Sequence, residues 1–376
     1  MLKGINLTLM IGPAVPIPVS HDILDALLEA KVVVTSGETL SGFELSFAIG
    51  KNSPLQTLFM LSGGVPLAIM RVVMAVTVNG TPNVIMDGVM MQHEVTSGAD
   101  PDHFILKIKG KDLLKVTDLI DFSGIPYPAM PEFARVALIL AKYAVLGMVP
   151  LVIPSVLTDI PIPVDRIPVQ KGKDFGYVKE LADQAGYAFY LEPGPQPGMS
   201  VAYWGPEIRV GVPQPALNFN MDALTNVESL DFTFNNEGAT LPVVFIQNQL
   251  TKVPIPIPIP NVSLLNPPLG LVPPIPTNIE PISGLAHMSP IRAALFGVSK
   301  AAQSQDVVEG TGSLDVLRYG RVLKARQLVG VRGAGAAFDG LYYVKSVTHK
   351  IKRGEYKQDF TLVRNGLLST VPAVPA

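Results

Sequence analysis

The chain has 376 residues, of which 48% are hydrophobic and 16% charged, and its mean hydropathy is +0.35. Its 29 basic and 31 acidic residues give a formal net charge of −2, which excludes a strongly basic nucleic-acid binder, and the absence of cysteine excludes disulfides and thiolate sites. The length exceeds one ordinary core and predicts two or three domains, while the apolar composition predicts an obligate oligomer with a large protein interface.

Two apolar stretches, 58–78 and 134–157, are the candidates for membrane spans. Prolines and Arg or Lys residues interrupt both, so neither offers the roughly 20 uninterrupted apolar residues that a spanning helix needs. The N-terminal run is broken by prolines and does not fit a cleavable signal. The sequence therefore predicts no stable membrane insertion.

Residues 4–110 follow a β pattern, with strands expected over INLTLMIG, AKVVVTSG, GFELSFAIG and the segments that follow. Asn79-Gly80 lies between two β-rich runs and predicts a tight hairpin. One short helix is expected over 20–30. These strands define a predicted first β-barrel domain, residues 1–111.

Residues 112–208 predict a small α/β insertion domain. One helix is expected to begin at Pro131 and to stop before Gly147, and a second to begin with Asp174 as its N-cap and to end at Gly186. The strand YAFYLEP should follow directly. The second helix has a buried stripe made of Tyr177, Val178, Leu181 and Ala182.

Residues 209–376 predict a second β-barrel domain that closes with the hairpin GLYYVKSVTHKIKRGEYKQDFTLVRNGL. A proline-rich segment, 253–282, contains PIPIPIP. Because each proline lacks an N–H donor, an extended, polyproline-like strap outside any central sheet is expected. A helix is expected over 289–303.

The two β regions resemble each other. MDGVMMQHEV followed by HFILKIKG matches FDGLYYVKSVTH followed by KQDFTLVRNG, which aligns Asp87-Gly88 with Asp339-Gly340 and makes His93 the counterpart of His349. Upstream, GFELSFAIG resembles VESLDFTFN. Either hairpin chemistry recurs by coincidence or a barrel is duplicated around an insertion, and two copies per chain would place six similar units around the axis of a trimer.

No catalytic constellation emerges from the residue pattern. The sequence contains no HExxH, GxSxG or Walker motif, and its glycine-rich GVRGAG precedes a strand rather than a helix. Asp159 with Asp165, and Glu180 with Asp183, are interpreted as solvated carboxylates. We therefore predict no metal, no cofactor and no enzyme activity. The histidines lack metal-ligand spacing and are His21, His93, His103, His287 and His349.

Two features are candidates for contact with partners. The terminal hairpin carries a basic cluster, which either protects a strand edge from aggregation or meets a partner ring. Trp204, the single tryptophan, is interpreted as a core or interface anchor, with a carbohydrate platform as the alternative. The cluster consists of Lys345, Lys350, Lys352, Arg353 and Lys357.

Several stretches together resemble the tail-hub or baseplate-hub proteins of phages and contractile injection systems. These are GTPNVIMDGVMMQHEV, YPAMPEFARVALILAKYAVLGMVPLVIP, a helix ending LADQAG before an aromatic strand, and the closing YYVKSVTH hairpin. The family includes the phage late control D protein, gp27-like hubs and the N-terminal hub part of VgrG.

This resemblance implies a mainly β fold with an α/β insertion, in which two tube-like β-barrels per chain form a pseudo-sixfold ring in a homotrimer. Such a ring adapts a sixfold inner tube to a threefold spike, and the implied partners are the inner tube protein, a separate spike protein and other baseplate components. Because VgrG proteins continue into an OB-fold and a needle, the spike is expected on another chain. The particle would assemble in the cytoplasm and be extracellular after release.

Interface residues are expected in the terminal hairpin, in the insertion and in the strap. The alternative function is a particle-associated carbohydrate-binding or hydrolytic protein that uses Trp204 and a carboxylate. The predicted interface residues are Lys350, Lys352, Arg353, Trp204, Pro256 and Pro258.

Overall fold

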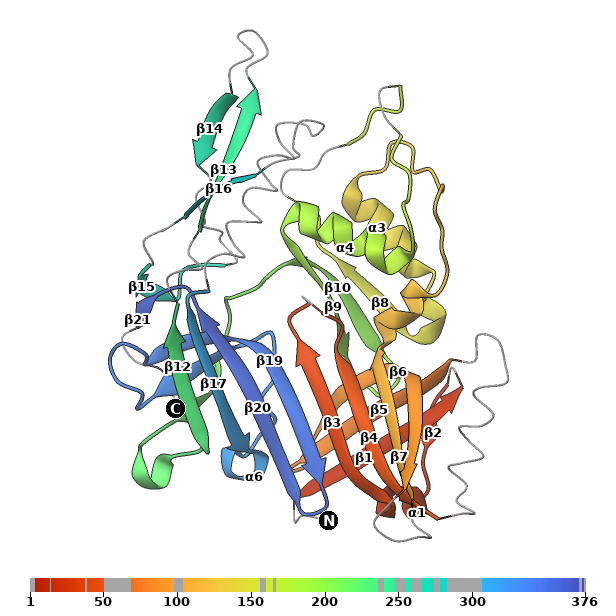
Figure 1. The fold of residues 1–376 in the computed structure, drawn as a ribbon, viewed down its shortest axis with the longest axis vertical. Helices are drawn as coiled ribbons and strands as arrows, with labels where there is room; N and C mark the ends of the chain where they lie inside the picture. Colours follow the sequence, from red (N-terminus) through yellow and green to blue (C-terminus); the bar gives the residue numbers. More distant parts are fainter. Residues whose placement is uncertain are drawn as a thin grey trace.

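The structure is a computed structural model. It describes residues 4–13, 15–37, 39–50, 69–97, 104–155, 160–164, 167–235, 240–247, 254–258, 266–273, 278–282, 306–371 and 374. The chain is mainly β, as predicted, with a small helical layer in its middle third (Figure 1).

The first third holds β1 (Ile5–Pro13), β2 (Ile17–Pro18), α1 (His21–Asp25), β3 (Leu27–Thr35), β4 (Gly42–Ile49), β5 (Met70–Val78), β6 (Thr81–Ser97) and β7 (Phe104–Asp112). The middle third holds η1 (Leu113–Asp118), α3 (Glu132–Ala141), η2 (Ala144–Leu146), β8 (Met148–Val152), α4 (Asp174–Ala185), β9 (Tyr187–Pro193) and β10 (Ser200–Pro206). The last third holds β11 (Gln214–Asn218), η3 (Asp222–Leu224), β12 (Ser229–Phe234), β13 (Thr240–Gln247), β14 (Pro254–Pro258), β15 (Gly270–Val272), β16 (Asn278–Ile282), β17 (Val308–Asp315), α6 (Val316–Tyr319), β18 (Leu328–Arg332), β19 (Gly340–Lys352), β20 (Glu355–Arg364) and β21 (Leu367–Ser369).

One 13-stranded sheet contains two copies of the same strand arrangement. In the first copy the order across the sheet is β3-β4-β7-β6-β5-β1, and in the second it is β12-β17-β20-β19-β18-β11. Numbered along the chain within each copy, both orders read second, third, sixth, fifth, fourth, first. The pairings agree in direction except that β1 lies antiparallel to β5 while β11 lies parallel to β18. This shared topology supports the duplication read from the two hairpins.

The two copies are joined edge to edge within the chain. β3 of the first copy pairs antiparallel with β19 of the second, so the strands of the two copies form one continuous sheet (Figure 1). No closed barrel is present among the residues described, and the expectation of two separate barrels in one chain is wrong. The edge of one copy is satisfied by its neighbour instead of by closure on itself.

The topology also corrects part of the sequence repeat. β6–β7 and β19–β20 occupy equivalent places, as the hairpin comparison predicts. The bulges that follow Met90 and Val344 make Val95 the counterpart of His349, so the pairing of His93 with His349 is wrong. β12, however, takes the place of β3 and not of β4, so the likeness of GFELSFAIG to VESLDFTFN aligned the wrong strands. Both strands alternate apolar and polar residues, and this period-two pattern does not distinguish neighbouring strands of a sheet.

Two large hydrophobic cores lie under these layers, beside a small cluster of Leu269, Leu328, Tyr343 and Val363. One contains buried residues of both copies, among them Leu45, Val72 and Leu362, and is continuous beneath the sheet. The other belongs to the insertion, where α3 and α4 pack on the sheet β8-β10-β9. The insertion therefore has a core of its own, as an α/β unit requires.

The helices of the insertion follow the sequence closely. α3 begins directly after Pro131, all four residues of the predicted stripe on α4 are buried, and Gly186 ends α4 with φ 74°. Asp174 is the first residue of α4 rather than its N-cap, because its buried carboxylate accepts hydrogen bonds from Tyr143 Oη at 2.7 Å and Gln170 Nε2 at 2.7 Å.

The helix expected over 20–30 is shorter than predicted. It ends at Asp25, and residues from Leu27 onward pair with β4 instead. The β-branched run Val32–Val34 pulls this segment into the sheet, since tertiary pairing overrides a weak local helix preference.

Part of the proline-rich segment forms a small separate sheet, ordered β14-β13-β16. Within this segment β14, which contains Pro256 and Pro258, is a strand that lies antiparallel to β13. β14 is an edge strand, the position in which missing N–H donors are tolerated. The segment does stay out of the 13-stranded sheet, and the helix expected over 289–303 lies outside the described residues.

No helix among the described residues is long and apolar enough to cross a membrane.

Candidate assembly site

The predicted chemical groups are dispersed over the structure. Within the described ranges, no group of three or more histidine, aspartate or glutamate side chains could hold a metal ion. His21 and His93 are exposed and His349 is buried, while His103, His287, Asp159 and Asp165 lie outside the described residues. On α4, Glu180 accepts from Gln184 and Asp183 pairs with Lys179, the pattern of a solvated helix face.

His349 is a neutral structural residue of the terminal hairpin. Its Nδ1 lies 2.7 Å from Tyr356 Oη and 3.4 Å from Gln358 Nε2. The backbone of Leu323 fixes the orientation of the Gln358 amide, because Leu323 N donates to Oε1 and Leu323 O accepts from Nε2. The N–H₂ group of Gln358 therefore faces the ring of His349, and Nδ1 accepts a hydrogen bond from it. Burial lowers the pKa of His349 to about 3.

We predict that His349→Ala lowers the free energy of unfolding by about 1–3 kcal/mol at pH 7, because it leaves Tyr356 Oη without this partner. The native pKa of about 3 lies below the unfolded value near 6.5, so the unfolded chain takes up the proton first as pH falls. The protein with His349 therefore loses free energy of unfolding as pH falls below about 6.5, whereas the variant does not. The difference in the free energy of unfolding between the two should shrink by about 1–2 kcal/mol at pH 5.

Urea unfolding at both pH values measures this difference. His93→Ala, at an exposed position of β6, is the matched control and should change stability by less than about 0.5 kcal/mol. The mass of the assembled protein should stay unchanged for both variants. A deficit for His349→Ala that is equal at pH 7 and pH 5 would show that the buried ring is not neutral.

The basic cluster of the hairpin is largely neutralised within the chain. Lys350 pairs with Asp359, Lys352 Nζ lies 3.6 Å from Glu29 Oε1, and Lys357 Nζ lies 2.9 Å from Glu228 Oε1. Arg353, exposed in the turn beside Gly354, forms no ion pair with the residues that the structure describes. The lysines do not protect a strand edge, because β19 pairs with β3 at Lys350 and Lys352 and β20 pairs with β17 at Lys357. Arg353 is the cation of the turn that faces outward.

Trp204 lies in the core of the insertion. Its side chain is fully buried, its ring meets Tyr187 edge to face at 4.8 Å, and Nε1 donates to Val178 O at 3.4 Å. It therefore offers no surface to a partner or to a sugar, and of the two anchor roles predicted for it the core role applies.

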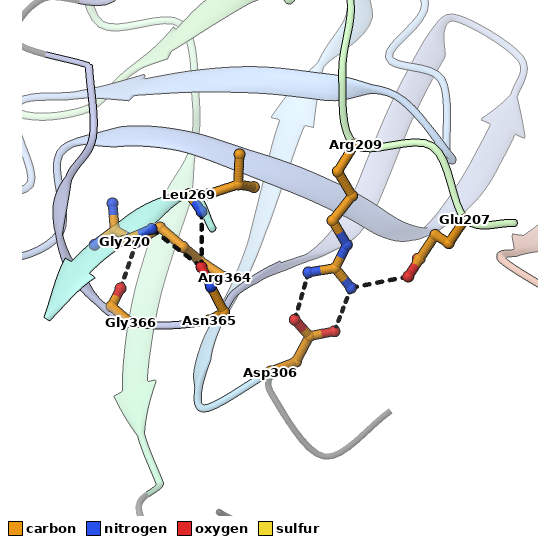
Figure 2. A network of polar contacts seen from close by, with 8 residues as sticks. All are labelled: Glu207, Arg209, Leu269, Gly270, Asp306, Arg364, Asn365 and Gly366. Atoms are coloured by element: carbon orange, nitrogen blue, oxygen red, sulfur yellow. Dashed lines mark hydrogen bonds and ion pairs between the residues drawn. The ribbon is translucent and has the colours of Figure 1, made fainter. Parts of the chain in front are cut away.

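The chain from 236 to 305, which contains the proline-rich segment, is called the excursion below. Asn365, which follows β20, holds residues 269 and 270 at the base of this excursion (Figure 2). The buried Oδ1 of Asn365 accepts from Leu269 N at 2.8 Å and from Gly270 N at 3.0 Å. Gly270 and Gly366 approach so closely that a Cβ on Gly270 would lie 2.5 Å from the carbonyl carbon of Gly366. This contact fixes β15 to β21 at the end of the second copy.

The return of the excursion is clamped by Arg209, which follows the insertion (Figure 2). Its guanidinium forms a fork on Asp306, with Nη1 at 2.6 Å and Nη2 at 2.8 Å from the two carboxylate oxygens, and Nη2 also lies 3.0 Å from Glu207. Asp306 is the first described residue after the excursion. Bidentate pairs of this kind hold geometry strongly, so the chain returns to the second copy at a fixed point.

We predict that Asn365→Ala releases the base of the excursion without unfolding the second copy. Two buried N–H groups lose their acceptor, which costs about 1–3 kcal/mol locally. Hydrogen exchange should accelerate over 266–273 and stay unchanged in β17 and β20. Asn226→Ala removes a comparable clamp, to Asn218 N and Ala216 O, and as a control should leave 266–273 protected. Protection of 266–273 in Asn365→Ala would contradict the clamp.

Three arginines, none of them singled out from the sequence, seat the insertion on the rest of the chain. Arg71 Nη2 lies 2.6 Å from Asp87 and donates to Gly198 O at 2.9 Å. Arg326 donates to Thr35 O at 2.8 Å and to Leu191 O at 3.0 Å, and so touches both copies and the insertion. Arg209 completes the set. A sequence signal was present for one of them, since Asp87 belongs to the repeated Asp-Gly step, but its partner is not local.

β12 and the end of β6 are among the strand edges that face outward in the described part of the sheet. β12 is the terminal strand in the sheet order, and β6 beyond Met90 pairs with β7 on one side only, as far as the described strands go. Apolar side chains are exposed on both, with Phe234 at 41% and Val95 at 49%. Exposed apolar strand edges in a well-packed protein mark sites of association.

Solved structures share this fold. The chain is similar to the tail protein from Neisseria meningitidis MC58, at 13% identity and a TM-score of 0.63 over 97% of this chain and 98% of that one. It is similar to the 43 kDa tail protein of prophage MuSo2 from Shewanella oneidensis, at 14% identity and 0.60 over 96% and 98%. It is also similar to the E. coli c3393 protein, at 11% identity and 0.53 over 93% and 78%.

The c3393 protein is described as a component of the type VI secretion system with structural similarity to the T4 bacteriophage tail proteins gp27 and gp5. No protein-family model and no curated protein matches the chain. At these identities the likeness establishes the fold, and the resemblance to tail-hub proteins that the sequence motifs indicate is confirmed at that level.

Proposed function

We propose that this chain, which has the fold of phage tail proteins, is a structural hub of a phage-like contractile injection particle. Three copies form a ring that joins a sixfold inner tube to a threefold spike, and the ring acts as channel, adaptor and anchor without turnover. The particle assembles in the cytoplasm and is released from the cell, with the spike and other baseplate components as partners.

The observation that carries this proposal is the repeated six-strand unit. Two units with one strand order lie side by side in one sheet, joined by β3 and β19. Because each chain contributes two such units, a trimer contains six of them. It therefore presents six similar faces to a sixfold partner while it keeps threefold symmetry itself. We propose 1–111 and 209–376 as these units and 112–208 as the insertion.

The two ends of the sheet are suited to different partners. The turn of β19–β20 and α1 lie at one end, while the insertion and the sheet β14-β13-β16 lie at the other (Figure 1). We propose that the hairpin rim, with Arg353 at its tip and Lys350 and Lys352 beside it, meets the inner tube. The excursion that contains Pro256 and Pro258 would then reach a neighbouring protomer or a baseplate partner from the opposite end.

The sugar-binding alternative loses its main support, since Trp204 is buried in the insertion core. Light scattering of the purified chain separates the two functions. A hub is expected at three times the chain mass of 40.2 kDa, at every concentration that can be measured. A stable monomer that binds soluble oligosaccharides would overturn the hub.

A further inference from the structure

The joint between the two copies has a defined geometry. β19 carries an extra residue, Lys345, at a bulge, and before the bulge the strand pairs with β18. Beyond the bulge the same side of β19 pairs with β3, where Thr348 lies opposite Val33 and His349 opposite Val32. One strand thus serves two neighbours in turn, and the second neighbour belongs to the other copy.

β6 has the same design in the first copy. Its extra residue at a bulge is Met91, and up to the bulge the strand pairs with β5, as β19 does with β18. Beyond the bulge, 94–97 pairs with β7 on one side, and no described strand lies against the other. β12, the counterpart of β3, likewise has a described partner only in β17.

We propose that β12 of one protomer pairs antiparallel with residues 94–97 of β6 in the next protomer, and so repeats between chains the β3–β19 joint made within each chain. The occupant of both edges is a second copy of this chain. The inference deepens the proposed trimeric hub and rests on it.

The existing pairings fix the register of this joint. Gly110 and Leu362 are equivalent, because each pairs with the last residue before a bulge. Through β4, Gly110 lies in line with Val32 of β3, and through β17, Leu362 lies in line with Phe232 of β12. Phe232 is therefore the equivalent of Val32. Thr233 then takes the place of Val33. Glu94 and Thr348 are each the third residue after their bulge. The joint therefore places Glu94 opposite Thr233, with Val95 opposite Phe232.

This register explains the exposed apolar residues. In the chain's own joint the core face of the two strands carries Val32, Val347 and His349, all buried. The equivalent face between chains would carry Phe232, Phe234, His93 and Val95, and in one protomer His93 is exposed while Phe234 and Val95 are 41% and 49% exposed. Pairing would cover them as β3 covers its counterparts, which removes apolar surface from water.

The joint is head to tail, because β12 and β6 are different surfaces of the same chain. Such contacts form a ring when the rotation closes and an open filament when it does not. Closure after three chains gives six joints in alternation, three within chains and three between them. The threefold hub requires this closure.

Disulfide trapping tests the register, since the chain has no native cysteine. The double variant Glu94→Cys/Thr233→Cys, both at exposed positions, is oxidised and separated on a non-reducing gel. Hydrogen-bonded and non-hydrogen-bonded pairs alternate along an antiparallel ladder, so the adjacent pair His93→Cys/Phe234→Cys samples the other geometry. The off-register pair Glu94→Cys/Phe234→Cys is the negative control, and Val33→Cys/Thr348→Cys is the matched pair within one chain.

At least one in-register pair should give cross-linked chains up to the trimer, with at least about tenfold more product than the off-register pair, because Cβ separations differ. The pair within one chain should give only a compact monomer band. Light scattering of the same samples separates the outcomes. A trimer without in-register cross-links would overturn this joint and leave the hub standing, a monomer would overturn both, and a ladder beyond the trimer would support the joint but contradict threefold closure.

Discussion

Asp87→Ala should lower the free energy of unfolding by about 3–5 kcal/mol, the cost of breaking a buried ion pair by removing one partner. Arg71 and Asp87 have side chains that are 4% and 0% exposed, and their contacts include Arg71 Nε to Oδ1 at 2.8 Å. Ser200 Oγ of the insertion also donates to Asp87 at 2.6 Å. The substitution therefore leaves a buried guanidinium and loosens the seat of the insertion. Urea unfolding measures the effect.

The matched control for this change is Lys357→Ala on β20, which removes partly exposed ion pairs with Glu228 and Glu355. Exposed pairs contribute about 0–1 kcal/mol, so this variant should unfold close to the native midpoint. If Asp87→Ala also costs less than about 1 kcal/mol, the ion pair is solvated and does not hold the insertion.

Arg326→Met should cost about 3 kcal/mol and should expose the junction of the two copies with the insertion. The guanidinium donates to Thr35 O and Leu191 O, pairs with Glu192 and lies 4.0 Å from the centre of the Tyr190 ring. Methionine keeps most of the apolar stem but satisfies none of these acceptors. Hydrogen exchange should accelerate in β9 and at the end of β3 before other parts of the sheet.

The same variant should become more sensitive to alkaline pH. Burial raises the pKa of Asp112 to about 7, and the charge of Arg326 opposes this rise. The native pKa lies above the unfolded value near 3.8, so the stability contributed by protonated Asp112 is lost as pH rises through about 7. Without Arg326 the native pKa rises further, and the deficit of Arg326→Met should be larger at pH 9 than at pH 6. An equal deficit at both would contradict the coupling.

The sequence predicts the local elements of this fold well. The Asn79-Gly80 turn joins β5 and β6, and the buried stripe and terminal glycine of α4 are where the 3.6-residue period places them. Local backbone preference and side-chain period determine these features, so a short window of sequence contains the information. The second hairpin was recognisable as a copy of the first for the same reason.

The non-local features could not be read from the sequence. The β3–β19 joint connects residues more than 300 positions apart, and period-two patterns do not say which edges meet. For the same reason β12 was aligned with the wrong strand of the first copy. Trp204 could not be assigned to core or interface, because an aromatic residue on an alternating strand fits both until the covering helices are known.

The candidate site was predictable only in part. The repeat indicated two similar units in one chain, and His349 was interpreted as part of the hairpin's architecture. The clamps formed by Asn365, Arg209 and Arg326 join distant segments through single side chains, and no spacing in the sequence marks them. Polar networks of this kind become visible only when the backbone positions are known.

Electron microscopy of the purified chain, seen along its symmetry axis, tests the trimeric hub directly. We expect class averages of a ring with an open centre, six similar lobes in the tier formed by the two sheet units, and threefold symmetry in the tier of the insertions. A particle without a central channel, or a ring in which the number of lobes equals the number of chains, would contradict the proposal that two units of one chain stand side by side in a trimeric hub.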